Sequence, residues 1–413
     1  MRRVVITGVG MITALGTGVE KSWARIKAGE CGIKKIESFN TENTSVKIAG
    51  EVTDFEPTDF GIEKKEVKKL ARNTQFAIAA AKMALEDAKF EITEENASSV
   101  GTIVSSGIGG MEVFEKQYSA LLNKGNRKVS PFTIPAMIAN MASGNVGIYT
   151  GAKGPNKTIV TACAAGTHSI GDAFEMIKHG KIDTMIAGGT EACITEFAVT
   201  GFANMKALST RNDEPLKASR PFNLDRDGFV MGEGAGVLIL EELEQAKARG
   251  AKIYAEIVGY GETCDAHHIT SPGPGGEGAA RAIEMALKQG NIEKNTVDYI
   301  NAHGTSTPAN DRLETAAIKT VFGDQAKKLA VSSTKGATGH ALGAAGGMEG
   351  VMLALAIDEG IMPPTINYEV PDEECDLDYI PNQSREKDIR VGMSTSLGFG
   401  GHNAAIVMKK YKN

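Results

Sequence analysis

Short apolar runs that end in glycine or other small residues recur along this chain of 413 residues, and helical patterns follow them. The clearest runs are residues 4–6, 101–104, 184–189, 297–300 and 329–332. Strands that alternate with helices are typical of α/β folds, and 48 glycines suit the tight turns between them. The same rhythm starts again after residue 250, so the sequence predicts two similar halves, residues 1–250 and 251–413.

The first run continues into Gly8 and Gly10, which makes it similar to a dinucleotide-binding motif. That motif needs a third glycine where this chain has Thr13, so we interpret the two glycines as part of a tight turn. Further along, the helical spacing of apolar residues predicts one long helix over residues 62–88.

Composition excludes several classes of protein. The net charge of −6 does not suit a nucleic-acid binder. No apolar run reaches the length that spans a membrane, and no apolar signal region follows Arg2 and Arg3. The five cysteines are odd in number and irregularly spaced, which predicts free thiols in a reducing compartment. We expect a soluble, cytoplasmic protein that binds neither nucleic acid nor membrane.

Cys163 lies between a predicted buried strand, residues 158–160, and a predicted helix in which apolar residues recur from Ile170 to Ile177. At such a turn the free N–H groups and the dipole of the helix favour a thiolate over a thiol. The small neighbours of Cys163 leave room for a substrate carbonyl. The alternative is a buried cysteine that serves only packing, and this stretch alone does not decide between the two.

Two histidines occupy places that match that of the cysteine. His303 follows the run 297–300, His340 follows the run 329–332, and both have a glycine beside them. Ligands of open α/β sheets bind beyond the carboxyl ends of strands, so we expect these histidines and Cys163 in one site. A zinc site is an alternative, but the spacings are long and no neighbouring carboxylate offers a further ligand. The set suits thioester chemistry, in which a thiolate accepts an acyl group, backbone N–H groups hold the oxyanion and two neutral imidazoles stabilise an enolate.

Four motifs together carry a resemblance to a known family. They are TACAAG around Cys163, NAHGTSTP at 301–308, SSTKGATGHALGAAG at 332–346 and GFGGHN at 398–403. The chain resembles the β-ketoacyl-acyl carrier protein synthases from its first predicted strand to its last, and most closely the elongating, type II-like bacterial enzymes of fatty acid synthesis. The resemblance implies a homodimer with an α/β, thiolase-like fold, in which two βαβαβαββ halves form a five-layered α-β-α-β-α core.

The resemblance also implies roles for individual residues. Cys163 matches the acyl-accepting nucleophile, and His303 and His340 match the pair that supports decarboxylation of a malonyl group and stabilises the enolate. Lys335 matches an active-site lysine whose charge orients or tunes His340. Phe399 matches the gating aromatic residue, whose N–H group forms the oxyanion hole together with that of Cys163. The expected substrate contacts are Thr305 and Thr307 on the phosphopantetheine arm, Ile108 and Phe202 along the acyl tunnel, and Gly400 beside the gate.

A basic cluster lies in the first half of the helix predicted over residues 62–88, on a protein that is otherwise acidic. It is either a solvated helix face or a docking site for an acidic partner, here acyl carrier protein. The cluster is Lys64, Lys65, Lys68 and Lys69, and it gains Arg127, Lys128 and Lys206 if the fold brings them near.

The resemblance further places Asn301, Glu349 and Ser394 around a structural monovalent cation. The chain departs from the common family pattern at three positions, Thr395, Leu397 and His402. The first departure weakens the expectation of a cation site, and the second changes the shape of the acyl pocket. None of the three touches the nucleophile or the two histidines.

The implied reaction is a decarboxylating Claisen condensation, which moves an acyl group from acyl carrier protein to Cys163 and then joins it to malonyl-carrier protein, with a gain of two carbons. No metal or redox cofactor is required, since the carrier protein brings the phosphopantetheine arm. A thiolase needs a second cysteine in the GFGGHN loop, and the initiating synthases have asparagine in place of His340. The alternatives are a free-standing polyketide ketosynthase, a cysteine hydrolase and a non-catalytic partner subunit, although such subunits lack the cysteine.

Overall fold

One mixed sheet runs through the whole molecule, in the strand order β10-β9-β13-β14-β8-β1-β7-β6-β5, with β2 paired to β1. The computed structural model describes residues 1–412, so residue 413 of the predicted second half lies outside the described residues. The strands of this sheet are β1 Val4–Thr13, β2 Gly16–Thr17, β5 Val100–Ser105, β6 Thr184–Glu191, β7 Gly234–Glu242, β8 Ala255–Cys264, β9 Tyr299–Asn301, β10 Ala330–Ser332, β13 Val391–Gly398 and β14 His402–Lys409.

Two short hairpins and the helices complete the fold. The hairpins pair β3 Lys34–Lys35 with β4 Ile48–Ala49, and β11 Ile361–Met362 with β12 Arg385–Glu386. The helices are α1 Val19–Lys27, α2 Lys64–Val67, α3 Arg72–Asp87, α4 Met111–Lys124, α5 Thr133–Met137, α6 Met141–Thr150, α7 Ala165–Lys178, α8 Glu196–Asn204, α9 Leu243–Ala248, α10 Glu277–Gln289, α11 Pro308–Phe322, α12 Lys335–Thr338 and α13 Ala345–Glu359.

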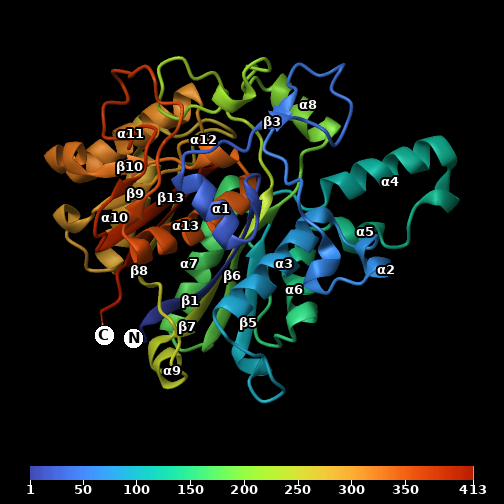
Figure 1. The fold of residues 1–413 in the computed structure, drawn as a ribbon, viewed down its shortest axis with the longest axis horizontal. Coiled ribbons are helices and arrows are strands. Elements are labelled where there is room, and N and C mark those ends of the chain that lie inside the picture. The colour runs from blue at the N-terminus through green and yellow to red at the C-terminus, as the bar shows by residue number, and fades with distance from the viewer. Residues whose placement is uncertain (413) are drawn as a thin grey trace.

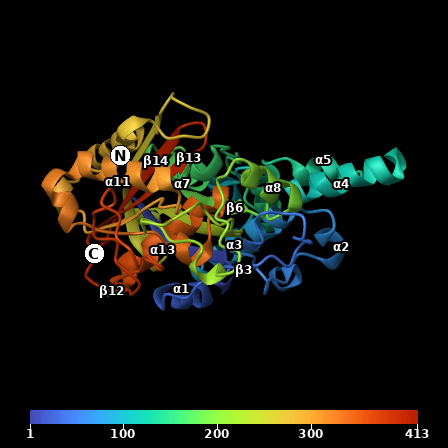
Figure 2. The ribbon, with the colours of Figure 1, turned by 90° about the horizontal axis from the view of Figure 1, so that it is seen from above.

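The helices and strands form five layers (Figures 1 and 2). Helices α3 and α6 cover the outer face of β1, β5, β6 and β7, and α10 and α11 cover the outer face of β8, β9, β10, β13 and β14. Helices α7 and α13 lie between the two groups of strands. These layers confirm the predicted α/β, thiolase-like architecture. The division near residue 250 stays a prediction, because β1 and β8 pair and join the strands of both halves into one sheet.

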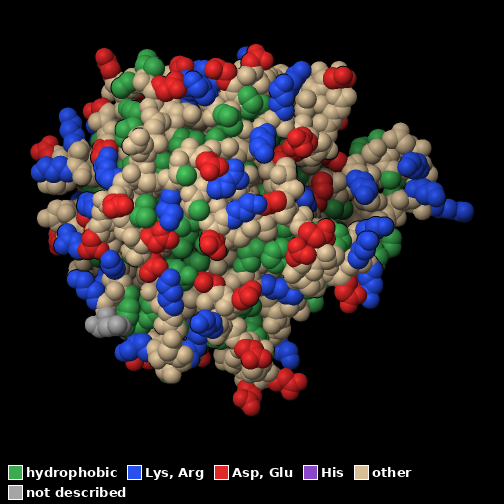
Figure 3. All heavy atoms as spheres, viewed as in Figure 1, with side chains coloured by type: hydrophobic (Ala, Val, Ile, Leu, Met, Phe, Trp, Pro, Cys, Tyr) green, Lys and Arg blue, Asp and Glu red, His purple; other side chains and the backbone are tan. Residues whose placement is uncertain are grey.

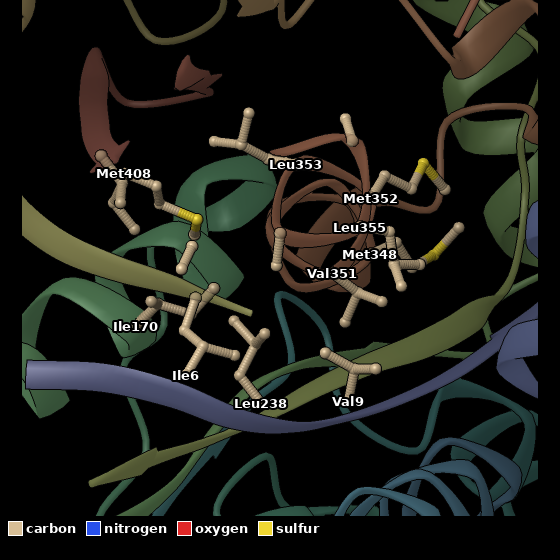
Figure 4. Packing of buried hydrophobic residues seen from close by; sticks show 14 of the residues in the cluster. Ile6, Val9, Ile170, Leu238, Met348, Val351, Met352, Leu353, Leu355 and Met408 are labelled. Carbon is tan, nitrogen blue, oxygen red and sulfur yellow. The ribbon is translucent and has the colours of Figure 1, made fainter. Parts of the chain in front are cut away.

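The central layer explains why α13 carries almost no polar face. Every residue from Ala345 to Ile357 in α13 is buried. Figure 4 shows α13 end-on, with Met348 and Val351 directed toward Val9 of β1 and Leu238 of β7. Because this helix is covered on all sides, its small and apolar residues hold the turn that precedes it in a fixed position.

The glycines at the start of the chain lie inside β1 and form no turn, so the sequence interpretation of Gly8 and Gly10 is wrong. A Cβ atom at these positions would lie 2.2 and 1.9 Å from carbonyl oxygens of α3. Gly259 and Gly261 of β8 show the same arrangement, with a Cβ atom 2.0 Å from carbonyl oxygens of α10. The glycines therefore let an outer helix pack directly on each group of strands.

Three further elements differ from the sequence prediction. The helix predicted over residues 62–88 is broken into α2 and α3, because Ala71 has an extended backbone with ψ 152°. Residues 158–160 form no strand: the segment follows a single bridge between Thr102 and Asn156 at the sheet edge, and Val160 is 55% exposed. The predicted loop over 394–401 is a tight hairpin, since β13 continues to Gly398 and β14 starts at His402.

In the part of the chain that the structure covers, residues 1–412, no helix has both the length and the apolar character needed to cross a membrane.

Candidate active site

Cys163 lies in a three-residue 3₁₀ turn, Ala162–Ala164, that leads into α7. The turn starts at Ala162, whose φ of 48° is in the left-handed region that non-glycine residues rarely adopt. The end of β13 packs against this turn so closely that a Cβ atom at Gly398 would lie 2.7 Å from the Thr161 carbonyl oxygen. The conformation around the thiol is therefore fixed by its neighbours.

A cavity of about 450 Å³ brings Cys163, His303 and His340 together. Most of the other predicted substrate contacts line the same cavity, namely Ile108, Phe202, Thr305, Thr307 and Phe399. Gly400 lies in the hairpin turn between two lining residues, Phe399 and Gly401. Leu397, one of the departures from the family pattern, is also part of the lining.

The two imidazole rings face each other edge-on, with centroids 5.2 Å apart and an angle of 88° between their planes. The backbone of each histidine is held by one hydrogen bond. The backbone N–H group of His303 donates to Glu314 Oε1 at 2.7 Å, and that of His340 donates to the Val230 carbonyl at 2.7 Å. Burial lowers the pKa of both rings well below the usual value, and the charge of Lys335 lowers it further. Both imidazoles are therefore neutral at physiological pH, and each can donate one hydrogen bond to a substrate oxygen.

The expectation of a thiolate at Cys163 is wrong for the resting site. Burial raises the pKa of the Cys163 thiol to about 12. The charge of Lys335 and the backbone N–H groups of Phe399 and Cys163 lower this pKa, as expected, but they are outweighed by burial. The same two N–H groups can hold a negative oxygen that forms beside the sulfur.

Lys335 is fully buried, and its ammonium group forms an ion pair with the carboxylate of Glu349 on α13. Burial raises the pKa of Glu349 to about 7, although the neighbouring ammonium opposes this shift. The ammonium charge also lowers the pKa of three groups at once: Cys163, His303 and His340. It therefore favours the neutral histidines and the ionised cysteine together.

The residues that were predicted to surround a cation are Asn301, Ser394 and Glu349. Asn301 and Ser394 are partners in the parallel register of β9 and β13. Both polar atoms of the Asn301 side chain, Ser394 Oγ and Glu349 Oε2 are buried and lack a hydrogen-bond partner in residues 1–412. Oxygen-rich, unsatisfied groups of this kind fit a hard cation or a water molecule. Thr395, where the family often has asparagine, is directed elsewhere and donates to Glu314 at 2.8 Å.

The zinc alternative has no geometric support. Within the described residues 1–412, no group of three or more histidine, cysteine, aspartate or glutamate side chains is arranged to hold a metal ion.

Two buried glutamates support the site and were missed by the sequence analysis. Glu191, at the end of β6, accepts hydrogen bonds from Ser106 Oγ at 2.6 Å and the Gly107 N–H at 2.8 Å, and so holds the loop that carries Ile108. Glu314 of α11 holds the loop of His303 in a similar way. The sequence does hold a signal for Glu191, because it is a single carboxylate at the end of an apolar run. No comparable local pattern distinguishes Glu314.

The predicted docking set is spread over several elements. Lys206 lines the cavity. Lys64 and Lys65 lie in α2, with Lys68 at its end, and Lys69 lies 5.1 Å from the Phe132 ring. Arg127 and Lys128 follow α4, which projects from the body of the molecule in Figures 1 and 2. Figure 3 shows basic side chains at the outer end of this projection. Lys65 and Lys69 form local ion pairs with Glu63 and Glu66.

Comparison with known proteins gives matches over the whole chain. Residues 1–246 match the family described as "Beta-ketoacyl synthase, N-terminal domain", and residues 254–369 match the corresponding C-terminal domain. A relative from Synechocystis sp., named "3-oxoacyl-[acyl-carrier-protein] synthase 2", is 54% identical over 411 residues, which cover 100% of this chain and 99% of the relative. A relative of the same name from Staphylococcus aureus is 53% identical with the same coverage.

Solved structures match equally completely. A structure described as the ishigamide ketosynthase/chain length factor has a TM-score of 0.93 at 37% identity and covers 100% of both chains. A β-ketoacyl synthase from Burkholderia phymatum has a TM-score of 0.92 at 35% identity, again over 100% of both chains. A third structure, of a type II PKS acyl-carrier protein in complex with its ketosynthase, has a TM-score of 0.91 at 37% identity and covers 100% of both chains.

Proposed function

Because the chain belongs to the β-ketoacyl synthase family, we propose that Cys163, His303 and His340 carry out the reaction of that family here. The chain is an acyltransferase of fatty acid synthesis, which elongates an acyl group by two carbons in a decarboxylating Claisen condensation. The observation that supports the assignment of residues is the cavity in which one cysteine meets two neutral imidazoles.

In the first half-reaction the sulfur of Cys163 attacks the carbonyl carbon of an acyl thioester. The carbonyl oxygen becomes negative, and the backbone N–H groups of Cys163 and Phe399 stabilise it. The bond to the pantetheine sulfur then breaks, and the proton of the Cys163 thiol goes to the departing thiolate. Because the resting group is a thiol, this proton transfer accompanies the attack.

In the second half-reaction a malonyl thioester loses CO₂, and its carbonyl oxygen takes the charge of the resulting enolate. His303 and His340 donate hydrogen bonds to that oxygen, for which neutral rings are required. The enolate carbon attacks the acyl group on Cys163, so a C–C bond forms and the C–S bond breaks. The released sulfur takes up one proton, and the product is a 3-oxoacyl thioester.

We propose that the substrates are acyl- and malonyl-acyl carrier protein, and that their phosphopantetheine arm passes Thr305 and Thr307. The hydroxyl oxygens of these threonines are 3.0 Å apart on the cavity wall, where they can bond the amide groups of the arm. The chemistry needs no resident cofactor. Asn301, Ser394 and Glu349 are assigned to a structural cation that stays outside the reaction, since their free polar atoms suit one.

We assign the basic docking set to carrier-protein binding. Its members are Lys64, Lys68, Arg127, Lys128 and Lys206, together with Lys65 and Lys69, which also pair with neighbouring glutamates. Carrier-protein contact is supported by the similar structure of a ketosynthase bound to its acyl-carrier protein. The variant Lys64→Glu/Lys68→Glu should raise the KM for acyl-carrier protein, and more strongly at low salt. An unchanged KM would instead favour a solvated helix face.

We propose that the chain forms a homodimer and that the apolar surface beside β5 is its interface. Three apolar side chains are exposed there: Ile134 (59%), Ile148 (73%) and Val160 (55%). Ile148 lies on α6, which packs on β5, the last strand of the sheet; Ile134 lies on α5, which packs on α6, and Val160 lies in the segment 158–160. A second copy that covers them would bury this surface and give the segment a strand to pair with. Sedimentation of an Ile148→Asp variant should show monomers, and a dimer that persists would reject this surface as the interface.

We place the reaction in the cytoplasm, since all five cysteines are free thiols. The polyketide alternative is less well supported. The relatives named for fatty acid synthesis are 53–54% identical to this chain, whereas the similar polyketide ketosynthase structure is 37% identical.

Intact-protein mass spectrometry tests the proposed function directly. After mixing with a long-chain acyl-carrier protein, the chain should carry one acyl group on Cys163, and this adduct should be stable in water. Malonyl-carrier protein should then discharge it as a 3-oxoacyl product. Discharge by water alone would indicate a cysteine hydrolase, and no adduct would indicate a non-catalytic subunit.

A further inference from the structure

The loop that carries Thr305 and Thr307 has a backbone conformation that its sequence does not favour. Ser306, between the two threonines, has φ 70°, in the left-handed region that a non-glycine residue rarely adopts. Side chains two residues apart on an extended strand are separated by about 6.6 Å along the chain. The bend at Ser306 brings the hydroxyl oxygens of the two threonines to 3.0 Å. We call these two residues the threonine pair.

Neighbouring groups bond Ser306 at each of its polar positions. Its backbone N–H group donates to Asp311 Oδ1 at 3.2 Å, and its hydroxyl accepts a hydrogen bond from the backbone N–H group of Arg220 at 2.9 Å. Its carbonyl accepts the N–H group of Gly228 at 3.2 Å. Interactions from three segments thus maintain a conformation that is unfavourable by itself.

Asp311 is the group that connects this bend to the rest of the site. It is fully buried, and besides Ser306 it accepts the N–H group of Phe222 at 2.8 Å. Phe222 is a second non-glycine residue with a left-handed backbone, at φ 64°. A single carboxylate therefore holds two unfavourable conformations, and an unpaired buried carboxylate would itself be unstable.

Arg226 lies beside this carboxylate and also touches the loop directly, while its Nη1 pairs with Asp372 at 2.6 Å. Its Nε lies 3.4 Å from Asp311 Oδ2, and its side chain is 4% exposed. It donates from Nε to the Thr307 carbonyl at 3.3 Å and from Nη2 to the Pro308 carbonyl at 3.1 Å. The guanidinium group and the carboxylate together hold the loop at Ser306, Thr307 and Pro308.

We infer that Asp311 and Arg226 are positioning residues for the pantetheine-binding site, because they hold the threonine pair in the geometry that receives the arm of the substrate. This inference rests on the proposed contact between the threonine pair and the phosphopantetheine arm. Neither residue touches the reacting atoms, so their loss should weaken the binding of arm-bearing substrates more than the chemistry at Cys163.

The test is Asp311→Asn, which keeps the shape of the side chain but removes its charge and one acceptor. We expect the KM for acyl- and malonyl-carrier protein to rise about tenfold, the effect of about one lost hydrogen bond, with kcat changed less than threefold. Alkylation of Cys163 by iodoacetamide, which has no pantetheine arm, should keep its rate within twofold. Arg226→Lys should raise the same KM values by a smaller factor, and it replaces Asp311→Asn if that variant does not fold.

Glu241→Gln is the matched control. Glu241 is also a buried carboxylate paired with an arginine, Arg249, but it lies at the far end of β7 and is absent from the cavity lining. The variant Glu241→Gln should lower the melting temperature without raising the KM for acyl- or malonyl-carrier protein. An unchanged KM in folded Asp311→Asn, or a parallel fall in its alkylation rate, would overturn the inference.

Thr305→Val separates this inference from the proposed function. If Thr305→Val raises the KM and Asp311→Asn does not, the positioning role is wrong and the substrate contact stands. If Thr305→Val leaves the KM unchanged, the contact between the threonine pair and the arm is wrong, and the positioning role falls with it. In both cases the acyl adduct on Cys163 tests the reaction itself independently.

Discussion

The turn that carries Cys163 has a counterpart in the second half of the molecule, at Gly343. Each turn starts with a non-glycine residue in the left-handed region, Ala162 at φ 48° and Leu342 at φ 47°. Each continues as a three-residue 3₁₀ turn and leads into a buried helix, α7 or α13. The two backbones are thus alike, residue by residue, while one carries a nucleophile and the other has no side chain.

The surroundings explain the difference. Cys163 faces the cavity, whereas the N–H group of Gly343 donates to Glu191 at 3.1 Å. A Cβ atom at Gly343 would lie 2.3 Å from the Gly107 nitrogen. The second turn therefore supports the Glu191 contact and the loop beside the acyl pocket. The backbone of this turn does not make a residue reactive; what packs against it does.

Replacing Cys163 by glycine makes the two turns alike and should have the largest effect. Without a nucleophile no acyl-enzyme forms, and condensation should fall by about 10⁴-fold or more, the size of loss found when a catalytic nucleophile is removed. The measurements are kcat/KM for condensation and the mass of the protein after exposure to acyl-carrier protein. Cys163→Ala serves as control for added flexibility and should be equally inactive. Acylation that persists in both variants would place the nucleophile elsewhere.

Gly343→Ala tests the supporting role of the second turn. The added methyl group meets backbone atoms of Gly107 and Ser106, which cannot rotate away, so we expect a loss of about 3 kcal/mol in the free energy of unfolding. Urea unfolding measures it. Gly201→Ala in α8 is the control, because its Cβ meets no atom within 4 Å and alanine favours a helix there. If both variants are equally stable, the close contact at Gly343 does not constrain the turn.

Local sequence patterns were sufficient for much of the site. Strand-end positions and flanking glycines predicted that Cys163, His303 and His340 would meet, and they line one cavity. For the two histidines this succeeded because they follow β9 and β10, two parallel strands whose carboxyl ends meet at one edge of the sheet. Cys163 follows no strand, and its 3₁₀ turn before α7 places it in the cavity. The further roles assigned to Lys335 and Phe399 came from the resemblance and stay predictions.

What failed depended on contacts distant in sequence. Gly8 was interpreted as a turn residue because the helix that packs on it lies more than seventy residues away. The ionisation of Cys163 was misjudged because local N–H groups can be read from a sequence, but the extent of burial cannot. The strand predicted over residues 158–160 lacks a second partner within the described chain, and pairing of strands is not a local property.

Glu191 links the Gly343 turn to the loop 106–108 beside the acyl pocket, and its ionisation should make the stability of this link depend on pH. Burial raises its pKa from 4.5 to about 7 in the folded chain. A carboxyl group with a raised pKa contributes its full stability below pH 4.5 and loses it as pH rises through 7, a change of about 3 kcal/mol. The free energy of unfolding of Glu191→Gln should lack this decline. We therefore expect the difference in unfolding free energy between the unmodified protein and Glu191→Gln to become smaller between pH 5 and pH 8. If the two plots of unfolding free energy against pH are parallel, other groups cause the pH dependence.

Lys335 lies in the second half of the chain, and its charge lowers the pKa of Cys163 in the first half. Its replacement therefore tests whether the two halves cooperate through charge. Burial holds the pKa of Cys163 at about 12, so the rate of alkylation by iodoacetamide should rise about tenfold for each pH unit between 7 and 9 without a plateau. Lys335→Met removes a charge that lowers this pKa and should slow alkylation about tenfold at every pH in that range.

The double variant Lys335→Met/Glu349→Gln distinguishes charge from damage, because it removes the ion pair as a whole and leaves no unpaired carboxylate in the interior. If Lys335 acts through its charge, the double variant should be alkylated as slowly as the single one, although it is more stable. If alkylation recovers in the double variant, the slow rate of Lys335→Met came from the uncompensated Glu349. The second half would then support the nucleophile through its packing alone, as it does at Gly343.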